Sequence, residues 1–219
     1  MPGRVSDAAL LAGGQGSRLG NGGSGKLETD LGGKALGLRA YLRLKDAFGE
    51  PIVVTQDGEA PPSLEGCRAI MDSPVGRGTA AGIAAALRTA EDWCFVAAAD
   101  MPFLDKGLIK ELIAMVEALP GDCVCAMPSW RKGLEPLHAF YRKGALGRIE
   151  EFLAAGKRSL TELSLFLGAA VLDAEAASGR CGADPETAFF NVNTGEDLDT
   201  ARVILYKLGD IKTEKGDLS

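Results

Sequence analysis

The chain has 219 residues, of which 46% are hydrophobic and 25% are charged, and it carries a formal net charge of −6. A chain of this length and composition can bury a sizeable core and fold as one domain. The acidic balance argues against a general nucleic-acid-binding protein, because binding a phosphate backbone requires positive charge concentrated on one face.

The sequence also argues against a membrane or secreted protein. No stretch approaches the roughly 20 uncharged apolar residues of a membrane span, and the opening residues lack the features of a secretory signal. The five cysteines are odd in number and mostly lie in apolar runs, which favours reduced thiols. Cys123 and Cys125 could share one face of a strand, but His138 is the only histidine, so no zinc site is expected. We expect a cytoplasmic protein.

Short apolar runs alternate with longer segments of helical period along the chain. This alternation is typical of parallel strands joined by helical crossovers. The candidate strands span residues 7–12, 51–55, 67–71, 93–99, 123–127, 137–142 and 169–173, and an alanine-rich helix is expected at 79–90. The pattern predicts a single-domain, three-layer, Rossmann-like α/β fold with a mostly parallel central sheet.

Two further helices carry recognisable start signals. Residues 105–119 repeat apolar side chains every three or four positions, and Asp105 can cap the first turn. Thr194 and Asp197 resemble a capping box that begins a last helix, ending near residue 208. We expect the domain to cover residues 1–208 and to be followed by a polar tail at 209–219.

The first candidate strand leads directly into a glycine-rich cationic segment, LAGGQGSRLGNGGSGKLETDLGGK, at residues 11–34. Residues 20–26 have the spacing of a P-loop, but Leu27 stands where a Ser or Thr hydroxyl should hold magnesium. Gly14 begins a dinucleotide-binding fingerprint, but Leu19 stands where its third glycine is required. Both of these interpretations are weak.

A third interpretation treats the segment as one phosphate-binding device. Backbone N–H groups of Gly13, Gly14 and Gly16 would line a concavity into which Arg18 and Lys26 reach. Two cations separated along a glycine-rich loop suit a triphosphate. The alternative is an ordinary surface loop.

An ordered series of motifs follows this segment. It comprises Asp72, GTAAGI at 78–83, ADMP at 99–102, EPLHAFY at 135–141, AGKR at 155–158 and NVNTGEDL at 191–198. Together with the glycine-rich segment, this series resembles the molybdenum cofactor guanylyltransferases, a branch of the nucleotidyltransferase superfamily, from about Ala8 to Ala201. The resemblance implies the nucleotide-diphospho-sugar transferase fold.

The resemblance also implies a reaction. GMP would be transferred from GTP to the phosphate of molybdopterin, with release of pyrophosphate, by Mg²⁺-assisted in-line attack without a covalent intermediate. A phosphate monoester is largely a dianion at neutral pH, so no general base is required. The implied partners are GTP and molybdopterin, with transient contacts to cofactor-delivery proteins or molybdoenzymes and none to nucleic acid or membrane.

The resemblance assigns roles to individual residues. Asp100 would hold Mg²⁺, because it follows a strand-like run and offers a hard oxygen ligand, and Asn193 would be a second ligand. Arg18 and Lys26 would neutralise the departing pyrophosphate. The implied nucleotide-binding residues are Leu11, Ala12, Gly13, Gly14, Lys26, Thr55, Asp72, Gly82 and Asp100.

Several positions leave alternatives open. Asp72 can accept two hydrogen bonds from the guanine edge, but it could equally be a turn residue. Thr55 departs from the asparagine usual in the family. TAAG at 79–82 replaces the usual PLAG, and the glycine-rich segment is two residues longer than expected. His138 is either a hydrogen-bonded, half-buried histidine or a contact for the acceptor.

The start of the glycine-rich segment, LAGG, favours the guanylyl branch over the cytidylyl branch. The remaining alternatives are a CTP-dependent molybdopterin cytidylyltransferase, a nucleotidyltransferase acting on a sugar or alcohol phosphate, and a non-catalytic nucleotide-binding adaptor.

Overall fold

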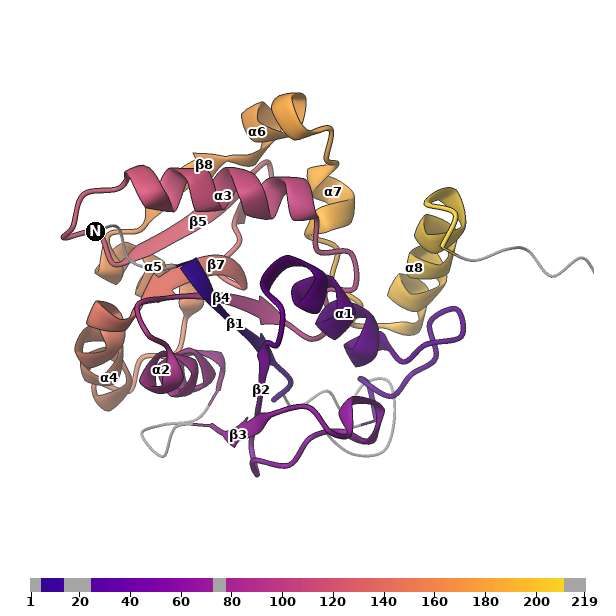
Figure 1. Ribbon diagram of the computed structural model, residues 1–219, viewed down its shortest axis with the longest axis horizontal. Helices are drawn as coiled ribbons and strands as arrows, with labels where there is room; N and C mark the ends of the chain where they lie inside the picture. Colours follow the sequence, from indigo (N-terminus) through magenta and orange to yellow (C-terminus); the bar gives the residue numbers. More distant parts are fainter. Residues whose placement is uncertain (1–4, 14–24, 73–77, 211–219) are drawn as a thin grey trace, which may run out of the picture.

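The computed structural model describes residues 5–13, 25–72 and 78–210, and its framework is a single sheet with helices on both sides (Figure 1). The strands are β1 (Val5–Leu11), β2 (Ile52–Thr55), β3 (Ala69–Met71), β4 (Trp93–Ala98), β5 (Cys125–Trp130), β6 (Gly133–Leu134), β7 (His138–Arg142) and β8 (Ala170–Asp173). Their order is β3-β2-β1-β4-β7-β5-β6, and β8 pairs with β5. The predicted mostly parallel α/β sheet is confirmed.

Among the described residues, the sheet is mostly parallel, with two antiparallel strands, β6 at one end, paired with β5, and β7 in the interior. β1 is parallel to both β2 and β4, and β5 is parallel to β8. β7 lies between β4 and β5 and runs antiparallel to both. Only seven residues separate Trp130 from His138, whereas a parallel crossover needs about a dozen or more. This short connection explains why β7 is antiparallel within the mostly parallel sheet.

The helices form two layers that cover opposite faces of the sheet. They are α1 (Leu36–Phe48), α2 (Thr79–Thr89), α3 (Lys106–Ala118), α4 (Leu146–Ala154), α5 (Leu160–Leu167), α6 (Ala174–Cys181), α7 (Pro185–Ala188) and α8 (Gly195–Lys207), with 3₁₀ turns η1 (Pro62–Leu64) and η2 (Lys143–Ala145). Helices α1, α3 and α6 share one buried cluster with the sheet, and α2, α4 and α5 share the other. Successive side chains of β1 alternate between the clusters, with Leu10 in the first and Leu11 in the second.

The predicted helix starts are confirmed. The carboxylate of Asp105 accepts hydrogen bonds from the backbone N–H groups of Gly107 and Leu108, at 2.7 and 3.0 Å. Thr194 and Asp197 form a capping box at the start of α8. Strand limits differ by a few residues, and the strand expected at 123–127 is found at Cys125–Trp130.

A third, smaller core attaches α8 to the rest of the domain. Its buried members come from the segment before α1, the start of α1, the β4–α3 connection, the segment before α8, and α8 itself: Leu31, Leu36, Phe103, Val192, Leu198, Ala201 and Leu205. Figure 1 shows α8, in yellow, on the side of the molecule where α1 lies. This cluster fixes the segment that carries Asn193 against the segment that follows Lys26.

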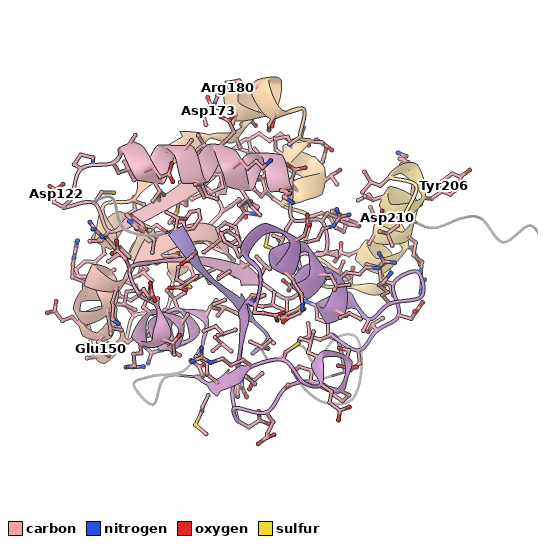
Figure 2. The ribbon with its side chains drawn as sticks, in the orientation of Figure 1. Asp122, Glu150, Asp173, Arg180, Tyr206 and Asp210 are labelled. Atoms are coloured by element: carbon pink, nitrogen blue, oxygen red, sulfur yellow. The ribbon has the colours of Figure 1, made fainter. Side chains whose placement is uncertain are left out.

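Several ion pairs lie at the periphery. Figure 2 labels Glu150 and Asp210 at the rim of the molecule, where they pair with Arg88 and Arg43 at 2.5 and 2.8 Å. Partly exposed pairs of this kind contribute about 0–1 kcal/mol each.

Within residues 5–13, 25–72 and 78–210, no helix is both long and apolar enough to cross a bilayer. The division into 1–208 and 209–219 stays a prediction, because residues 211–219 are outside the described ranges.

Candidate active site

The candidate site lies at the carboxyl ends of β1, β2 and β4. Beyond the end of β1, the Ala12 N–H donates to the carbonyl of Val54 on β2, and the Ala99 N–H beyond β4 donates to the carbonyl of Leu11, at 2.9 and 3.1 Å. Ala12 therefore continues the line of β1 between its two neighbours, with Gly13 next. In open α/β sheets, ligands bind outside this edge.

Three polar side chains from distant parts of the chain meet at this edge. The Lys26 ammonium donates to Oδ2 of Asp100 at 2.7 Å and to Oδ1 of Asn193 at 2.8 Å. The side chains of Lys26 and Asp100 are 11% and 25% exposed, so the pair is partly shielded from water and still reachable from it. Lys26 is thus brought together with Asp100 and Asn193, the two residues predicted to hold a metal ion.

A rigid anchor positions Lys26. The next residue, Leu27, is buried, and its carbonyl accepts from the Gly37 N–H of α1 at 2.9 Å. A Cβ on Gly37 would lie 3.2 Å from the Leu27 Cβ, so the glycine permits this close approach. The Glu28 carboxylate accepts from the N–H and, at 2.8 Å, from the hydroxyl of Ser63. The Glu28–Ser63 contact could not be predicted from the sequence, because no spacing rule connects the two residues.

Asp100 and Asn193 are held together by the backbone. The carbonyl of Asp100 accepts from the N–H of Val192, a fully buried residue, at 3.0 Å. Oδ2 of Asp197 accepts from the N–H groups of Asn193 and Thr194, at 2.9 and 2.8 Å. The capping box therefore orients Asn193 as well as starting α8.

The same contacts determine the charge of Asp197. Burial raises the pKa of this carboxyl, but the hydrogen bonds from Asn193 and Thr194, with the nearby charge of Lys26, outweigh burial and hold the pKa below its usual range. Asp197 is thus a second carboxylate close to the Lys26 ammonium. The sequence analysis assigned it only a capping role.

Leu11, Asp72 and Gly82 converge beside this polar group. Gly82 lies in the first turn of α2, where a Cβ would be 3.3 Å from the Leu11 side chain and 3.8 Å from Oδ1 of Asp72. A larger residue at position 82 would displace Leu11 or the carboxylate. Three of the predicted nucleotide-binding residues therefore surround one point at the strand ends.

The donor set fits a hard divalent cation. One carboxylate and one amide oxygen point at a single cationic group, here the Lys26 ammonium, and magnesium commonly takes one or two protein oxygen ligands with the remainder from water and phosphates. Among the described residues, no group of three or more His, Cys, Asp or Glu side chains is arranged to hold a metal ion.

Comparison with known proteins gives the family. Residues 8–170 match the family model described as a MobA-like NTP transferase domain. This match covers more than half of the chain. The chain belongs to the MobA-like NTP transferase family. It is therefore a nucleotidyltransferase, as predicted from the motifs.

Individual MobA-like proteins agree with this assignment. A probable molybdenum cofactor guanylyltransferase of Pelotomaculum thermopropionicum is 34% identical over 196 residues, covering 89% of this chain and 91% of its own. The structure of molybdopterin-guanine dinucleotide biosynthesis protein A from Archaeoglobus fulgidus has a TM-score of 0.76 at 30% identity, over 92% and 99% of the two chains. The Thermus thermophilus 2-C-methyl-D-erythritol 4-phosphate cytidylyltransferase shares only the fold, with a TM-score of 0.61 at 18% identity over 93% and 100%.

Thr55 departs from the pattern expected of MobA-like chains, and its surroundings give it a local role. Its side chain is buried, and Oγ1 accepts from the Gly58 N–H at 2.9 Å. Its carbonyl accepts from the Asp72 N–H at 2.7 Å. A predicted base contact at Thr55 stays a prediction, while its backbone positions Asp72 directly. A Cβ added to Gly13 would be in ordinary van der Waals contact with Gln56, the residue after Thr55.

The surroundings of His138 differ from both interpretations offered for it. The ring is fully buried rather than half-buried, between the rings of Phe95 and Phe189, whose centroids lie 5.0 and 5.1 Å away. Neither ring nitrogen has a hydrogen-bond partner in the part of the chain that the structure describes. Burial lowers the pKa of His138 to about 3, so the ring is neutral at pH 7. It has no surface from which to contact an acceptor in this conformation.

Three predicted residues of the glycine-rich segment, Gly14, Gly16 and Arg18, lie outside the described residues. Their roles in binding phosphate stay predictions.

Proposed function

We propose that this chain transfers GMP from GTP to the phosphate of molybdopterin and releases pyrophosphate. The observation that carries the proposal is the convergence of Lys26, Asp100 and Asn193 at the strand ends, beside Leu11 and Asp72. The names of the Pelotomaculum and Archaeoglobus relatives support guanine as the base and molybdopterin as the acceptor.

The reaction needs charge neutralisation more than proton transfer. An oxygen of the acceptor phosphate attacks the α-phosphorus of GTP, a new P–O bond forms, and the bond to the β-phosphate oxygen breaks. The acceptor is already an anion at neutral pH, so no proton has to be removed. Positioning two repelling anions in line is the main task of the site. No enzyme nucleophile and no covalent intermediate are required.

Three residues divide this task. Asp100 and Asn193 would hold a divalent cation, proposed to be Mg²⁺, which supplies positive charge to the triphosphate oxygens when it is bound. Lys26 would donate hydrogen bonds to the β- and γ-phosphate oxygens and stabilise the negative charge that develops on the departing pyrophosphate. Backbone donors from Leu11 to Gly14 and the side chain of Arg18 would complete the phosphate contacts.

Base selection is assigned to the group around Gly82. The Asp72 carboxylate can accept from both N1–H and N2–H of guanine. Cytosine offers a single amino donor, so the carboxylate would make fewer hydrogen bonds to it. Gly82 leaves room for the base against Leu11, because a side chain at this position would occupy that space.

Pyrophosphate release tests the proposal directly. Purified protein is incubated with Mg²⁺, molybdopterin and either GTP or CTP, and pyrophosphate is measured. We expect release that depends on molybdopterin and prefers GTP. A preference for CTP would contradict the guanylyl assignment, and release only with a different phosphate acceptor would contradict the molybdopterin assignment.

The same experiment separates an enzyme from a nucleotide-binding adaptor. An adaptor would bind GTP without releasing pyrophosphate under any of these conditions. The cytoplasmic location and the transient contacts with delivery proteins or molybdoenzymes stay predictions.

A further inference from the structure

Lys26 occupies the position that the proposed function assigns to a metal ion. Its ammonium is hydrogen-bonded to Oδ2 of Asp100 and Oδ1 of Asn193. These are the two side chains that the proposed function assigns to the divalent cation. One cationic group therefore donates to both oxygens.

The surroundings of Lys26 make this arrangement stable without a ligand. The side chain is only 11% exposed, and its charge lies near both the Asp100 and the Asp197 carboxylates. Partly buried carboxylates without a counter-charge are costly. The ammonium supplies that counter-charge, and the Leu27 and Glu28 contacts hold the backbone beside it in place.

We propose that Lys26 is a resident counter-ion that keeps the Asp100–Asn193 pair closed to divalent cations until a nucleoside triphosphate is present. The triphosphate offers the ammonium new anionic partners. When the ammonium moves to them, the oxygens of Asp100 and Asn193 become free to bind a divalent cation. Nucleotide and metal therefore bind together, and metal alone binds weakly. This inference rests on the proposed function only in taking Asp100 and Asn193 as the metal-binding side chains.

The proposal has a reciprocal consequence. If triphosphate opens the pair to metal, metal must strengthen triphosphate binding by the same factor. Part of this coupling arises from direct contact between metal and phosphate oxygens, and that part does not involve Lys26. The measurement that isolates the lysine is therefore metal binding without any nucleotide.

The test is a titration of nucleotide-free protein with Mn²⁺, in which free Mn²⁺ is followed by electron paramagnetic resonance. We expect Lys26→Met to bind Mn²⁺ at least tenfold more tightly than the unaltered chain. Lys110→Met, an exposed residue of α3, removes the same charge and should leave the affinity unchanged. Lys26→Met combined with Asp100→Asn should lose the gain, which places the ion at Asp100.

Two further variants test whether the change in Mn²⁺ affinity is due to the positive charge of Lys26 and not to a folding defect. Lys26→Arg keeps the cation and should show no gain in Mn²⁺ affinity. Lys26→Gln removes it with a polar replacement and repeats the test if the methionine variant does not fold, as judged by circular dichroism.

The possible results separate this inference from the proposed function. Equal nucleotide-free affinities for Lys26→Met and the unaltered chain, with tight Mn²⁺ binding to both once GTP is added, would overturn the counter-ion role and leave the proposed function standing. A gain in Lys26→Met that survives Asp100→Asn would also overturn it. Absence of Mn²⁺ binding to the unaltered chain even with GTP would refute the metal site of the proposed function itself.

Discussion

Lys26 and Asp100 are 74 residues apart in sequence and are joined by a 2.7 Å ion pair at the carboxyl edge of the sheet. Neither residue is placed there by its neighbours alone. Asp100 follows the central strand β4, whereas Lys26 arrives from a segment anchored by Leu27 and Glu28. The pair joins the two parts of the chain on which the proposed chemistry depends.

Asp100→Asn should abolish turnover while preserving the fold. The substitution keeps the size of the side chain but removes its charge, and we expect pyrophosphate release to fall by at least roughly 100-fold. Circular dichroism should remain unchanged. Asp199→Asn, at a carboxylate of α8 that is 77% exposed, provides the matched control and should retain activity. Near-normal turnover in Asp100→Asn would refute its assigned role.

Lys26→Met should weaken binding of triphosphate far more than binding of nucleoside. Loss of a charged donor costs about 1.5–3 kcal/mol, so the Kd for GTP should rise about 10- to 100-fold, while the Kd for guanosine changes little. Isothermal titration calorimetry with the two ligands measures the difference. Equal losses for both would indicate that Lys26 only shapes the loop.

Ser63→Ala should weaken GTP binding indirectly, through the segment that carries Lys26. Its hydroxyl donates to Glu28 at 2.8 Å, and losing this bond should lower the free energy of unfolding by about 1–2 kcal/mol. We expect weaker GTP binding as well, because the anchor of Lys26 loosens. Ser178→Ala, which removes a hydroxyl bond within α6, should affect stability alone. If both variants bind GTP as the unaltered chain does, Glu28 and Ser63 do not position Lys26.

Gly82→Val should cost both stability and nucleotide binding. A side chain here meets Leu11 at 3.3 Å, and overpacking of this kind typically costs about 1–3 kcal/mol. Gly179→Val, in α6, has open space around it and serves as the control in a urea unfolding series. Thermal-shift titration with GTP then reports binding. Full GTP affinity in Gly82→Val would exclude this position from the base site.

His138 should make the stability of the chain depend on pH. Its pKa is about 3 in the folded chain and near 6.5 in a model peptide, so the unfolded state binds the proton more readily. The stabilisation is complete above pH 6.5 and is lost progressively as the pH falls toward 3. Between pH 7.5 and 5.0, this one group should reduce the free energy of unfolding by about 2 kcal/mol.

His138→Leu tests that dependence, because the chain has no other histidine. Urea unfolding at pH 7.5 and 5.0 should show a smaller decrease for the variant, by about the same 2 kcal/mol. Parallel pH dependences for the two proteins would mean that the pKa of His138 is the same in the folded and the unfolded state.

The sequence predicts which residues belong to the candidate site better than it predicts the contacts between them. Local signals identify Asp100, at a strand end, and Asp105 and Thr194, at helix starts, because capping and strand periodicity act over a few residues. The bond from Lys26 to Asn193 spans 167 residues and depends on the small core that attaches α8, which no local pattern encodes.

The reversed direction of β7 illustrates a different limit. The alternation of strands and helices predicts parallel pairing, and it does so correctly for β1, β2 and β4. For β7 the deciding quantity is the length of its connection to β5, which is too short for a crossover. His138 lies at the start of that strand, and its complete burial follows from packing against Phe95 and Phe189 rather than from its own sequence neighbours.

The attachment of α8 has a consequence for how the protein is made. Residues 191–207 supply Asn193 and the buried face of α8, and both lie beyond the segment matched by the family model, which ends at residue 170. A ribosome delivers this part of the chain after the whole sheet has emerged. The proposed cation site can therefore form only after residues 191–207 have been synthesised, and a nascent chain that ends before residue 191 would carry Lys26 and Asp100 without Asn193.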